Sequence, residues 1–130
     1  MKFLKMNHNA ILPSRATPGS AGYDLCASED AIIPAGTHKL IKTGIGWTNI
    51  PHNVVGLIWP KSGPSYKLGV DILGGVIDSD YDIKDIGVII DLAGRTNDMI
   101  IKAGDSIAQL IIQTYLTVDN EEPPKSTRTG

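Results

Sequence analysis

The chain has 130 residues, of which 42% are hydrophobic and 20% charged, and its formal net charge is −2. These values fit one globular domain and exclude both a second independent core and a disordered chain. The charge excludes a basic footprint for duplex nucleic acid, and no apolar run could span a bilayer, so we expect neither partner. The N-terminus has no secretory signal, and the single cysteine, Cys26, excludes a disulfide framework. We therefore expect a soluble intracellular protein, cytoplasmic or in another reducing compartment, with Cys26 as a small buried side chain.

Short apolar, β-branched runs recur between turn residues and predict an all-β sandwich or barrel. The clearest runs are Ala31–Ile33, Lys39–Thr43, Val54–Trp59, Gly87–Ile90 and Ile107–Leu116. No helical periodicity is sustained, and we expect at most one short helix, near Ser62 to Lys67. The polar segment 119–130 contains two prolines and predicts an extended arm, so that the β domain covers residues 1–118.

Two segments in the first half of the chain suggest chemistry. In Pro18–Leu25, Asp24 is either a functional acid or a solvated or capping residue in a loop that enters a strand. In Pro60–Pro64, a small hydroxyl and a glycine let backbone N–H groups approach an anion, and Lys61 adds charge. The alternative for this second segment is an ordinary helix start capped by Ser62.

Two further segments follow in the second half. Gly74–Tyr81 and Ile86–Ile90 flank a polar stretch and predict a hairpin. In that hairpin, one aspartate either orients water beside a polyphosphate or only stabilises the turn. In Ala103–Ile112, Gln109 interrupts an apolar run. If Gln109 is buried, its amide needs hydrogen-bond partners, which come from the protein or from a ligand. The alternative, which is the more common outcome, is that Gln109 lies on the solvent face of an edge strand.

Together, the four segments resemble the trimeric deoxyuridine triphosphatases (dUTPases). They match the first four motifs of that family in its order and spacing, and the resemblance extends from about Pro18 to the C-terminus. The matching stretches are Ala21-Gly22-Tyr23-Asp24-Leu25, Pro60-Lys61-Ser62-Gly63, Gly75-Val76-Ile77-Asp78-Ser79-Asp80-Tyr81 and Gly104-Asp105-Ser106-Ile107-Ala108-Gln109-Leu110-Ile111. Each motif alone is modest, but four in order make a chance match very unlikely.

The resemblance implies a β-clip fold, which is a distorted jelly roll, and a homotrimer whose active sites are shared between subunits. It implies Mg2+-dependent hydrolysis of dUTP to dUMP and pyrophosphate in nucleotide metabolism, which limits uracil in DNA and supplies dUMP for dTMP. A Mg2+ ion held mainly by substrate phosphates explains why the sequence has no dense cluster of carboxylates.

The resemblance also implies roles for single residues. Asp78 matches the catalytic carboxylate that orients the water attacking the α-phosphorus, and Tyr81 matches the aromatic that packs on the deoxyribose. Asp24 matches the acid that meets the hydrated metal through water. Main-chain groups in the hairpin would read uracil, and motifs two and four would contact phosphate. The positions expected to bind substrate are Lys61, Ser62, Gly63, Gly75, Val76, Ile77, Asp78, Tyr81, Gly87, Gln109 and Arg128.

The sequence departs from the family pattern within three motifs. Lys61 replaces the usual Arg, and because Lys cannot form a bidentate fork, we expect retained but weaker triphosphate or subunit contacts. Residues 82–85 fill a turn that is usually shorter and contains Arg-Gly, so we expect an altered hairpin tip. Ser106 replaces another usual Arg, which removes a cation from the site or the subunit contact.

The fifth motif is incomplete. It is normally an Arg-led, glycine-rich arm with a Phe that covers the uracil, whereas here the sequence stops after Arg128-Thr129-Gly130 and its only Phe is Phe3. Either a longer mobile arm follows residue 130 or the protein ends there. We favour the first, because such termini are often disordered until a ligand orders them. An intact mass measurement separates the two.

Two other functions stay open at this point. The same fold serves dCTP deaminases and their bifunctional relatives, although the match over Gly75–Tyr81 favours dUTP. A catalytically weak regulatory or binding protein with this fold is supported by Lys61, Ser106 and the incomplete arm.

Overall fold

The structure is a computed structural model that describes residues 1–63 and 70–128. Its described residues form β-strands joined by turns and loops, apart from Ser62 and Gly63, which adopt helical conformation. The strands are β1 (Lys2–Lys5), β2 (Tyr23–Cys26), β3 (Ala31–Ile33), β4 (His38–Lys42), β5 (Ile45–Thr48), β6 (Val54–Trp59), β7 (Asp71–Leu73), β8 (Val76–Ile77), β9 (Gly87–Asp91), β10 (Met99–Ile101) and β11 (Ser106–Thr114). The all-β prediction is confirmed; β3 and β6 match the predicted runs, and the ends of β4, β9 and β11 are shifted by one or two residues. The rest of the helix expected up to Lys67 lies outside the described residues.

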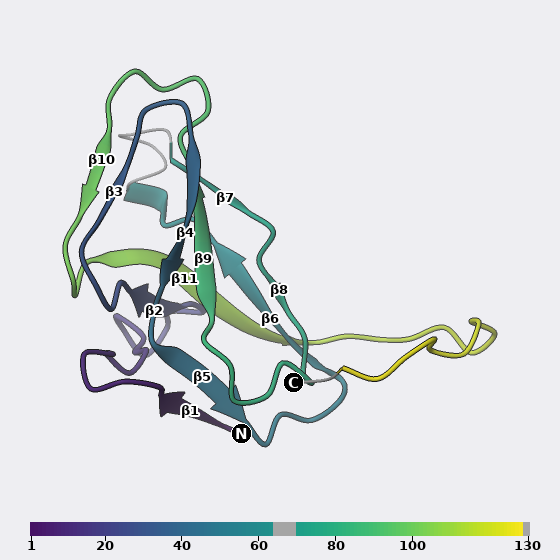
Figure 1. The fold of residues 1–130 in the computed structure, drawn as a ribbon. Coiled ribbons are helices and arrows are strands. Elements are labelled where there is room, and N and C mark those ends of the chain that lie inside the picture. Colours follow the sequence, from purple (N-terminus) through teal and green to yellow (C-terminus); the bar gives the residue numbers. More distant parts are fainter. Residues whose placement is uncertain (64–69, 129–130) are drawn as a thin grey trace.

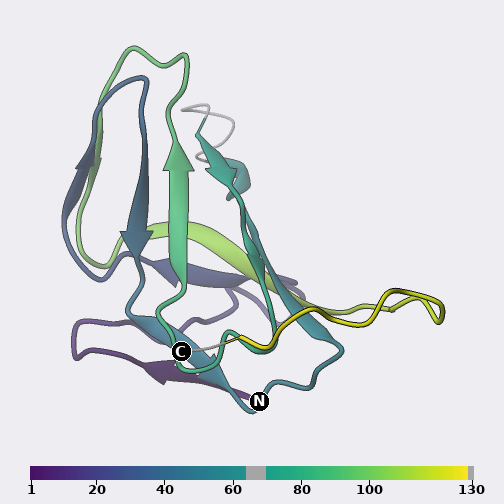
Figure 2. The ribbon, with the colours of Figure 1, turned by 45° about the vertical axis from the view of Figure 1, so that its right-hand side comes forward.

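Two larger antiparallel sheets make the body of the domain. One has the order β2-β11-β6-β8 and the other the order β4-β9-β7. Figures 1 and 2 show that the long strand β11 runs across the direction of β4 and β9. Two small sheets, β1-β5 and β10-β3, extend this framework. No helix within residues 1–63 and 70–128 is long and apolar enough to cross a bilayer.

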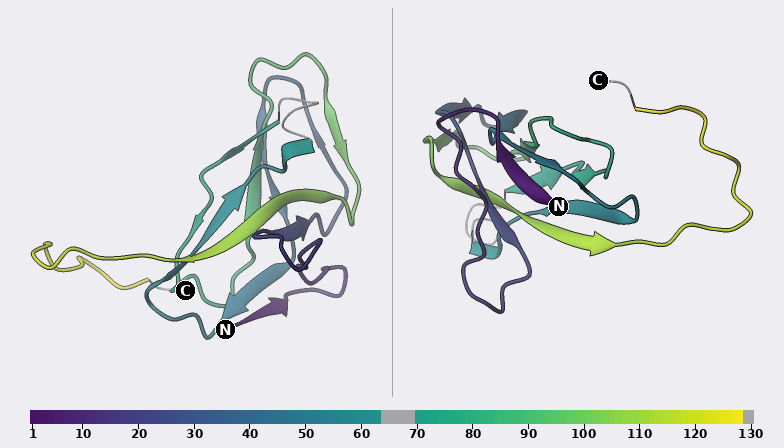
Figure 3. Two further views of the ribbon diagram at one scale, coloured as in Figure 1. Left: turned by 180° about the vertical axis from the view of Figure 1, so that it is seen from behind. Right: turned by 90° about the horizontal axis from the view of Figure 1, so that it is seen from below.

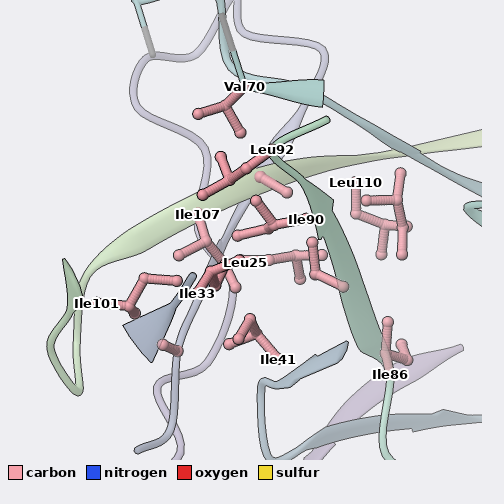
Figure 4. Packing of buried hydrophobic residues seen from close by; sticks show 14 of the residues in the cluster. Leu25, Ile33, Ile41, Val70, Ile86, Ile90, Leu92, Ile101, Ile107 and Leu110 are labelled. Carbon is pink, nitrogen blue, oxygen red and sulfur yellow. The ribbon is translucent and has the colours of Figure 1, made fainter. Parts of the chain in front are cut away.

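The core lies between the inner faces of the two larger sheets (Figure 4). Leu25 and Leu110 come from one sheet, and Ile41, Val88 and Ile90 from the other; all are at most 2% exposed. Burial alternates along β9, as expected for a strand with one face on a core. Because successive side chains point to opposite faces, burying Val88 and Ile90 sets Gly87 and Ile89 on the outer face.

Two glycines transfer the chain from one sheet to the other. β7 pairs with β9 as far as Leu73↔Ile89, and β8 then pairs with β6 instead, at Leu57↔Val76. Between them, Gly74 and Gly75 have φ of 63° and 103°, a region that glycine enters without steric cost. The predicted hairpin is therefore wrong in its pairing, because the strand before Asp78 leaves β9 at these glycines.

The C-terminal segment follows β11. No strand is assigned from residue 115 to residue 128, and Leu116 is 96% exposed. Figure 3 shows the segment leaving the domain and then bending back toward it. It ends with Arg128 on the turn after β8, where this residue bonds Asp78 and Asp80. The boundary between domain and arm at residue 118 stays a prediction.

Candidate functional site

The first group of predicted residues forms what we call the lysine cluster: Asp24, Lys61, Ser106 and Gln109. Lys61 Nζ donates to Asp24 Oδ1 at 2.7 Å and to Ser106 Oγ at 3.1 Å. The Lys61 and Asp24 side chains are each 29% exposed. One ammonium group thus ties the first, second and fourth motifs together, and water still reaches it.

Gln109 lies on the central strand of its sheet, not on an edge. β11 has β2 on one side and β6 on the other, and Gln109 faces Asp24 in register. Its Nε2 donates to Pro60 O at 3.0 Å. A Cβ at Gly22 would lie 2.3 Å from Gln109 Oε1, so a larger residue here would displace the Gln109 side chain. Of the two interpretations of Gln109, the hydrogen-bonded one is found and the edge-strand one is wrong.

The second group surrounds a cavity of about 480 Å³, which we call the glycine pocket. It opens on the outer face of β4 and β9, beside the point where the chain changes sheets. Its lining residues are Leu40, Lys42, Leu73, Gly75, Val76, Ile77, Asp78, Tyr81, Asp85, Gly87, Ile89 and Arg128.

Main chain is exposed along one edge of this pocket. Gly87 and Val88 pair with β4, but β7 reaches β9 only from Ile89 onward. Within the described strands, this stretch of β9 therefore has a partner on one edge only. The chain that leaves β9 is bound by β6 of the other sheet, since Ile58 N donates to Gly75 O at 2.8 Å. The unpaired edge leaves main-chain groups that a ligand could pair with.

The turn of residues 82–85 fixes Tyr81 at the rim of the pocket. Asp85 accepts hydrogen bonds from Thr43 N at 3.3 Å and Gly44 N at 2.9 Å. Tyr81 Oη in turn donates to Asp85 O at 2.8 Å. Ile83 has a φ of 52°, which is unusual for a β-branched residue. The expected alteration of the turn stays a prediction, but this segment anchors Tyr81.

Arg128 spans the two aspartates of the third motif. Its Nη2 donates to Asp78 Oδ2 at 2.7 Å and its Nε to Asp80 Oδ1 at 2.8 Å. Its Cζ also lies 5.7 Å from the centre of the Tyr81 ring, within cation–π range. The hydrogen bond to Asp80, together with both carboxylate charges, raises the pKa of the Arg128 guanidinium. Arg128 thus stays charged beside Asp78 and neutralises part of the negative charge of the two aspartates.

The structure brings the predicted residues together in two groups rather than one. Among the described residues, none of the lysine cluster lines the glycine pocket. Ser62 and Gly63 are exposed at the start of the helical turn that follows Lys61. No set of three or more His, Cys, Asp or Glu side chains in the described chain could hold a metal ion.

Some features of the site were not anticipated. Leu40, Lys42, Leu73 and Ile89 line the pocket, but in the sequence they are ordinary members of strand-like runs and carry no distinguishing signal. Cys26 was predicted to be a small buried side chain, but it is only half-buried. Burial and the nearby Asp24 charge raise the pKa of the Cys26 thiol.

Comparisons with known proteins point to one family. The model of the dUTPase family matches residues 8–130. The deoxyuridine 5'-triphosphate nucleotidohydrolase of Paramecium bursaria Chlorella virus 1 is 42% identical over 115 residues, covering 88% of this chain and 79% of that protein. The vaccinia virus (strain Copenhagen) nucleotidohydrolase is 44% identical over 122 residues, covering 94% and 80%.

Solved structures show the same fold. A mutant dUTPase from phage phi11 of S. aureus, described with a structural Mg(II) ion, has a TM-score of 0.85 at 24% identity and covers 98% of each chain. A mutant dUTPase of Staphylococcus bacteriophage 80alpha with dUpNHpp has a TM-score of 0.85 at 23% identity and covers 99% of this chain and 90% of that one. The predicted β-clip, jelly-roll type of fold is confirmed.

Proposed function

We propose a mechanism for a chain that belongs to the dUTPase family and is therefore a deoxyuridine 5'-triphosphate nucleotidohydrolase. Water attacks the α-phosphorus of dUTP, and a bond forms between the water oxygen and that phosphorus. The bond from the α-phosphorus to the oxygen that bridges the α- and β-phosphates breaks, and this oxygen leaves with pyrophosphate. The other product is dUMP.

The uracil ring enters the glycine pocket. The one-sided edge of β9 at Gly87 offers main-chain groups to the ring, and Gly75 lets the opposite wall approach closely. Val76 and Ile77 continue that wall. Tyr81, which Asp85 holds in place, packs on the deoxyribose and leaves no room for a 2'-hydroxyl.

Asp78 orients the attacking water and accepts its proton. In the structure its carboxylate is bound by Arg128 at 2.7 Å. A triphosphate carries more negative charge than the two aspartates, so we expect Arg128 to move to the phosphates and free Asp78 to act as the base. Phosphoryl transfer relies on such positioning and charge neutralisation more than on covalent chemistry.

The lysine cluster receives the phosphates, with Ser62 and Gly63 as further contacts. Mg2+, when bound, neutralises phosphate charge. The residues present fit an ion that the substrate holds and that keeps several of its waters, because the described chain has no carboxylate cage. Asp24 would meet such an ion through water, since Lys61 occupies only one of its oxygens.

The complete site requires more than one subunit in this proposal. The separation of the lysine cluster from the glycine pocket within one chain supports a homotrimer in which each site takes one group from each of two neighbours. The exposed apolar side chains Leu116 and Val118, which follow β11, are further candidates for burial between subunits.

The single observation that carries the mechanism is the glycine pocket, which places Asp78, Tyr81 and Arg128 around an open main-chain edge. The test is release of pyrophosphate from dUTP, dTTP, dCTP and UTP, each with Mg2+ and with EDTA. We expect hydrolysis of dUTP that EDTA abolishes and little hydrolysis of the others. An absence of preference for dUTP would contradict the base-pocket assignment, and ammonia release from dCTP would indicate a deaminase.

A further inference from the structure

Ser106 stands at the start of β11, where the strand departs from regular pairing. Ser106 faces Cys26 on β2. Ala108, two residues later, faces Leu25, which is the adjacent residue of β2. Ile107 is therefore an extra residue on β11, and the pair of strands contains a β-bulge at this point. Bulges are common beside active sites, because they turn a side chain in a new direction.

The bulge decides on which face of the sheet Ser106 lies. In a regular strand, Ser106 would share the inner face with Ala108 and Leu110, which are both fully buried. Here Ile107 and Ala108 are both buried, whereas Ser106 is exposed. The β2 partner of Ser106 lies two residues from the β2 partner of Gln109, so these two side chains of β11 share the outer face. The bulge thus brings a serine into the lysine cluster.

The lysine cluster has two hydrogen-bond donors left to give. Ser106 Oγ accepts from Lys61 Nζ at 3.1 Å, and Lys61 Nζ also donates to Asp24 Oδ1 at 2.7 Å. An ammonium has three donors, and a hydroxyl accepts and donates at the same time. Within residues 1–63 and 70–128, no acceptor is bound to the third N–H of Lys61 or to the hydroxyl proton of Ser106.

Two neighbouring donors suit an anion with several oxygens, such as a phosphate group. The Ser106 hydroxyl is a good donor here, because hydrogen bonds in a chain polarise one another and its oxygen already accepts from a cation. The lysine cluster does not line the glycine pocket, which takes the base and holds Asp78 beside the α-phosphorus. The cluster therefore meets the part of the triphosphate farthest from the base, which leaves as pyrophosphate.

We infer that Ser106 is a phosphate-binding residue whose hydroxyl, aimed by the bulge and polarised by Lys61, donates to the β- or γ-phosphate of dUTP. This inference rests on the proposed function, since it takes the lysine cluster as the phosphate site. The departure from the family pattern at position 106 then removes a guanidinium but supplies a neutral donor. Because the reacting phosphorus lies elsewhere, Ser106 contributes to binding more than to the chemical step.

The experiment uses the full-length protein with Mg2+ and two probes, dUpNHpp, which carries three phosphates, and dUMP, which carries only the α-phosphate. Ser106→Ala should raise KM for dUTP and Kd for dUpNHpp by about 10-fold, as expected for the loss of one hydrogen bond to a charged group. The Kd for dUMP and kcat for dUTP should change little, because only ground-state binding of the outer phosphates is lost. Ser106→Thr keeps the hydroxyl and should retain most of the wild-type affinity for dUpNHpp.

Two further variants separate a direct contact from an indirect one. Thr114→Val removes an exposed hydroxyl from the other end of β11, and it should leave both KM and Kd unchanged. Ser106→Ala is also made in the Lys61→Met background. If Ser106 acted only by holding the ammonium of Lys61, the second substitution would have no further effect. We expect it to weaken dUpNHpp binding again.

The outcomes are distinct. The inference is wrong if Ser106→Ala binds dUpNHpp as tightly as the wild type does, or if it loses affinity for dUpNHpp and dUMP equally. It is also wrong if Ser106→Ala has no effect in the Lys61→Met background. If the wild-type protein releases no pyrophosphate from dUTP, the proposed function fails, whereas the affinities for dUpNHpp still test the contact of Ser106 with phosphate.

Discussion

The lysine cluster and the glycine pocket recognise ligands by different means. The lysine cluster uses side-chain charge, with one ammonium shared between Asp24 and Ser106. The glycine pocket uses main-chain groups and aliphatic walls, and glycines, which have no side chain, stand at positions 75 and 87. Charge acts over distance and tolerates substitution, so Lys can stand where the resemblance implies Arg. Shape tolerates less, because a Cβ at Gly87 would lie 2.4 Å from Leu40 Cδ1 and the Leu40 side chain would have to shift.

The largest effect is expected in the pocket, at Asp78. Asp78→Asn preserves size but removes the base, and we expect kcat for dUTP to fall by about 10²–10⁴-fold. Asp80→Asn is the matched control, because Asp80 also binds Arg128 and lies two residues away. A loss in Asp80→Asn as large as that in Asp78→Asn would show that the Arg128 contacts matter and not a base at Asp78. Single-turnover kinetics would measure both.

A smaller effect is expected in the lysine cluster. Lys61→Met keeps the aliphatic stem but removes the charge from Asp24 and the phosphates, and we expect KM for dUTP to rise by about 10-fold, as for the loss of one charged hydrogen bond. Lys102→Met is the control, because Lys102 forms a longer ion pair with Asp30, at 3.9 Å, and is 70% exposed. Equal changes of KM in the two variants would show that Lys61 does not bind the phosphates.

Lys61→Arg tests how specifically the cluster is adapted to lysine. The ammonium fits between Asp24 and Ser106, whereas a planar guanidinium needs different directions for its hydrogen bonds. We expect a measurable change in KM or kcat. If Lys61→Arg left both constants unchanged, the expectation that Lys61 makes weaker contacts than an arginine would be wrong.

A modest effect on stability is expected from Tyr81→Phe. The variant keeps the ring but loses the hydrogen bond to Asp85 O, which should cost about 1 kcal/mol of unfolding free energy. Denaturant unfolding followed by fluorescence measures this change. Tyr115→Phe provides a comparison, because Tyr115 Oη donates to His52 O outside the pocket. An unchanged midpoint in Tyr81→Phe would mean that the turn does not depend on this bond.

The smallest effect concerns Cys26, which lies on β2 together with Asp24 of the lysine cluster. Its pKa is raised by burial and by the Asp24 charge and is lowered by Lys61, so little thiolate is present at neutral pH. Alkylation of the folded protein should therefore be slower than that of the unfolded chain and should accelerate as the pH rises. Lys61→Met should slow it further, since a cation that lowers the pKa is lost. Faster alkylation in Lys61→Met would contradict this coupling.

Some of these features could be predicted from sequence because they depend on neighbours in the chain. The short apolar runs Val54–Trp59 and Gly87–Ile90, bounded by turn residues, predict strands, and the order of the motifs indicates the family. The pairing of the third motif could not be predicted. It depends on two consecutive glycines with positive φ, and the sequence is equally compatible with a simple hairpin.

The sequence alone determined the all-β character of the protein. It also determined which residue types are present: the glycines, the acid at position 78 and the substitutions at 61 and 106. Which groups meet was decided by the tertiary structure. Lys61 bonds Ser106 across 45 positions in the chain, and Leu40 lies over Gly87 on a neighbouring strand. Such contacts follow from strand register and from the packing of two sheets on one core. Register is a property of pairs of distant segments, which no single segment encodes.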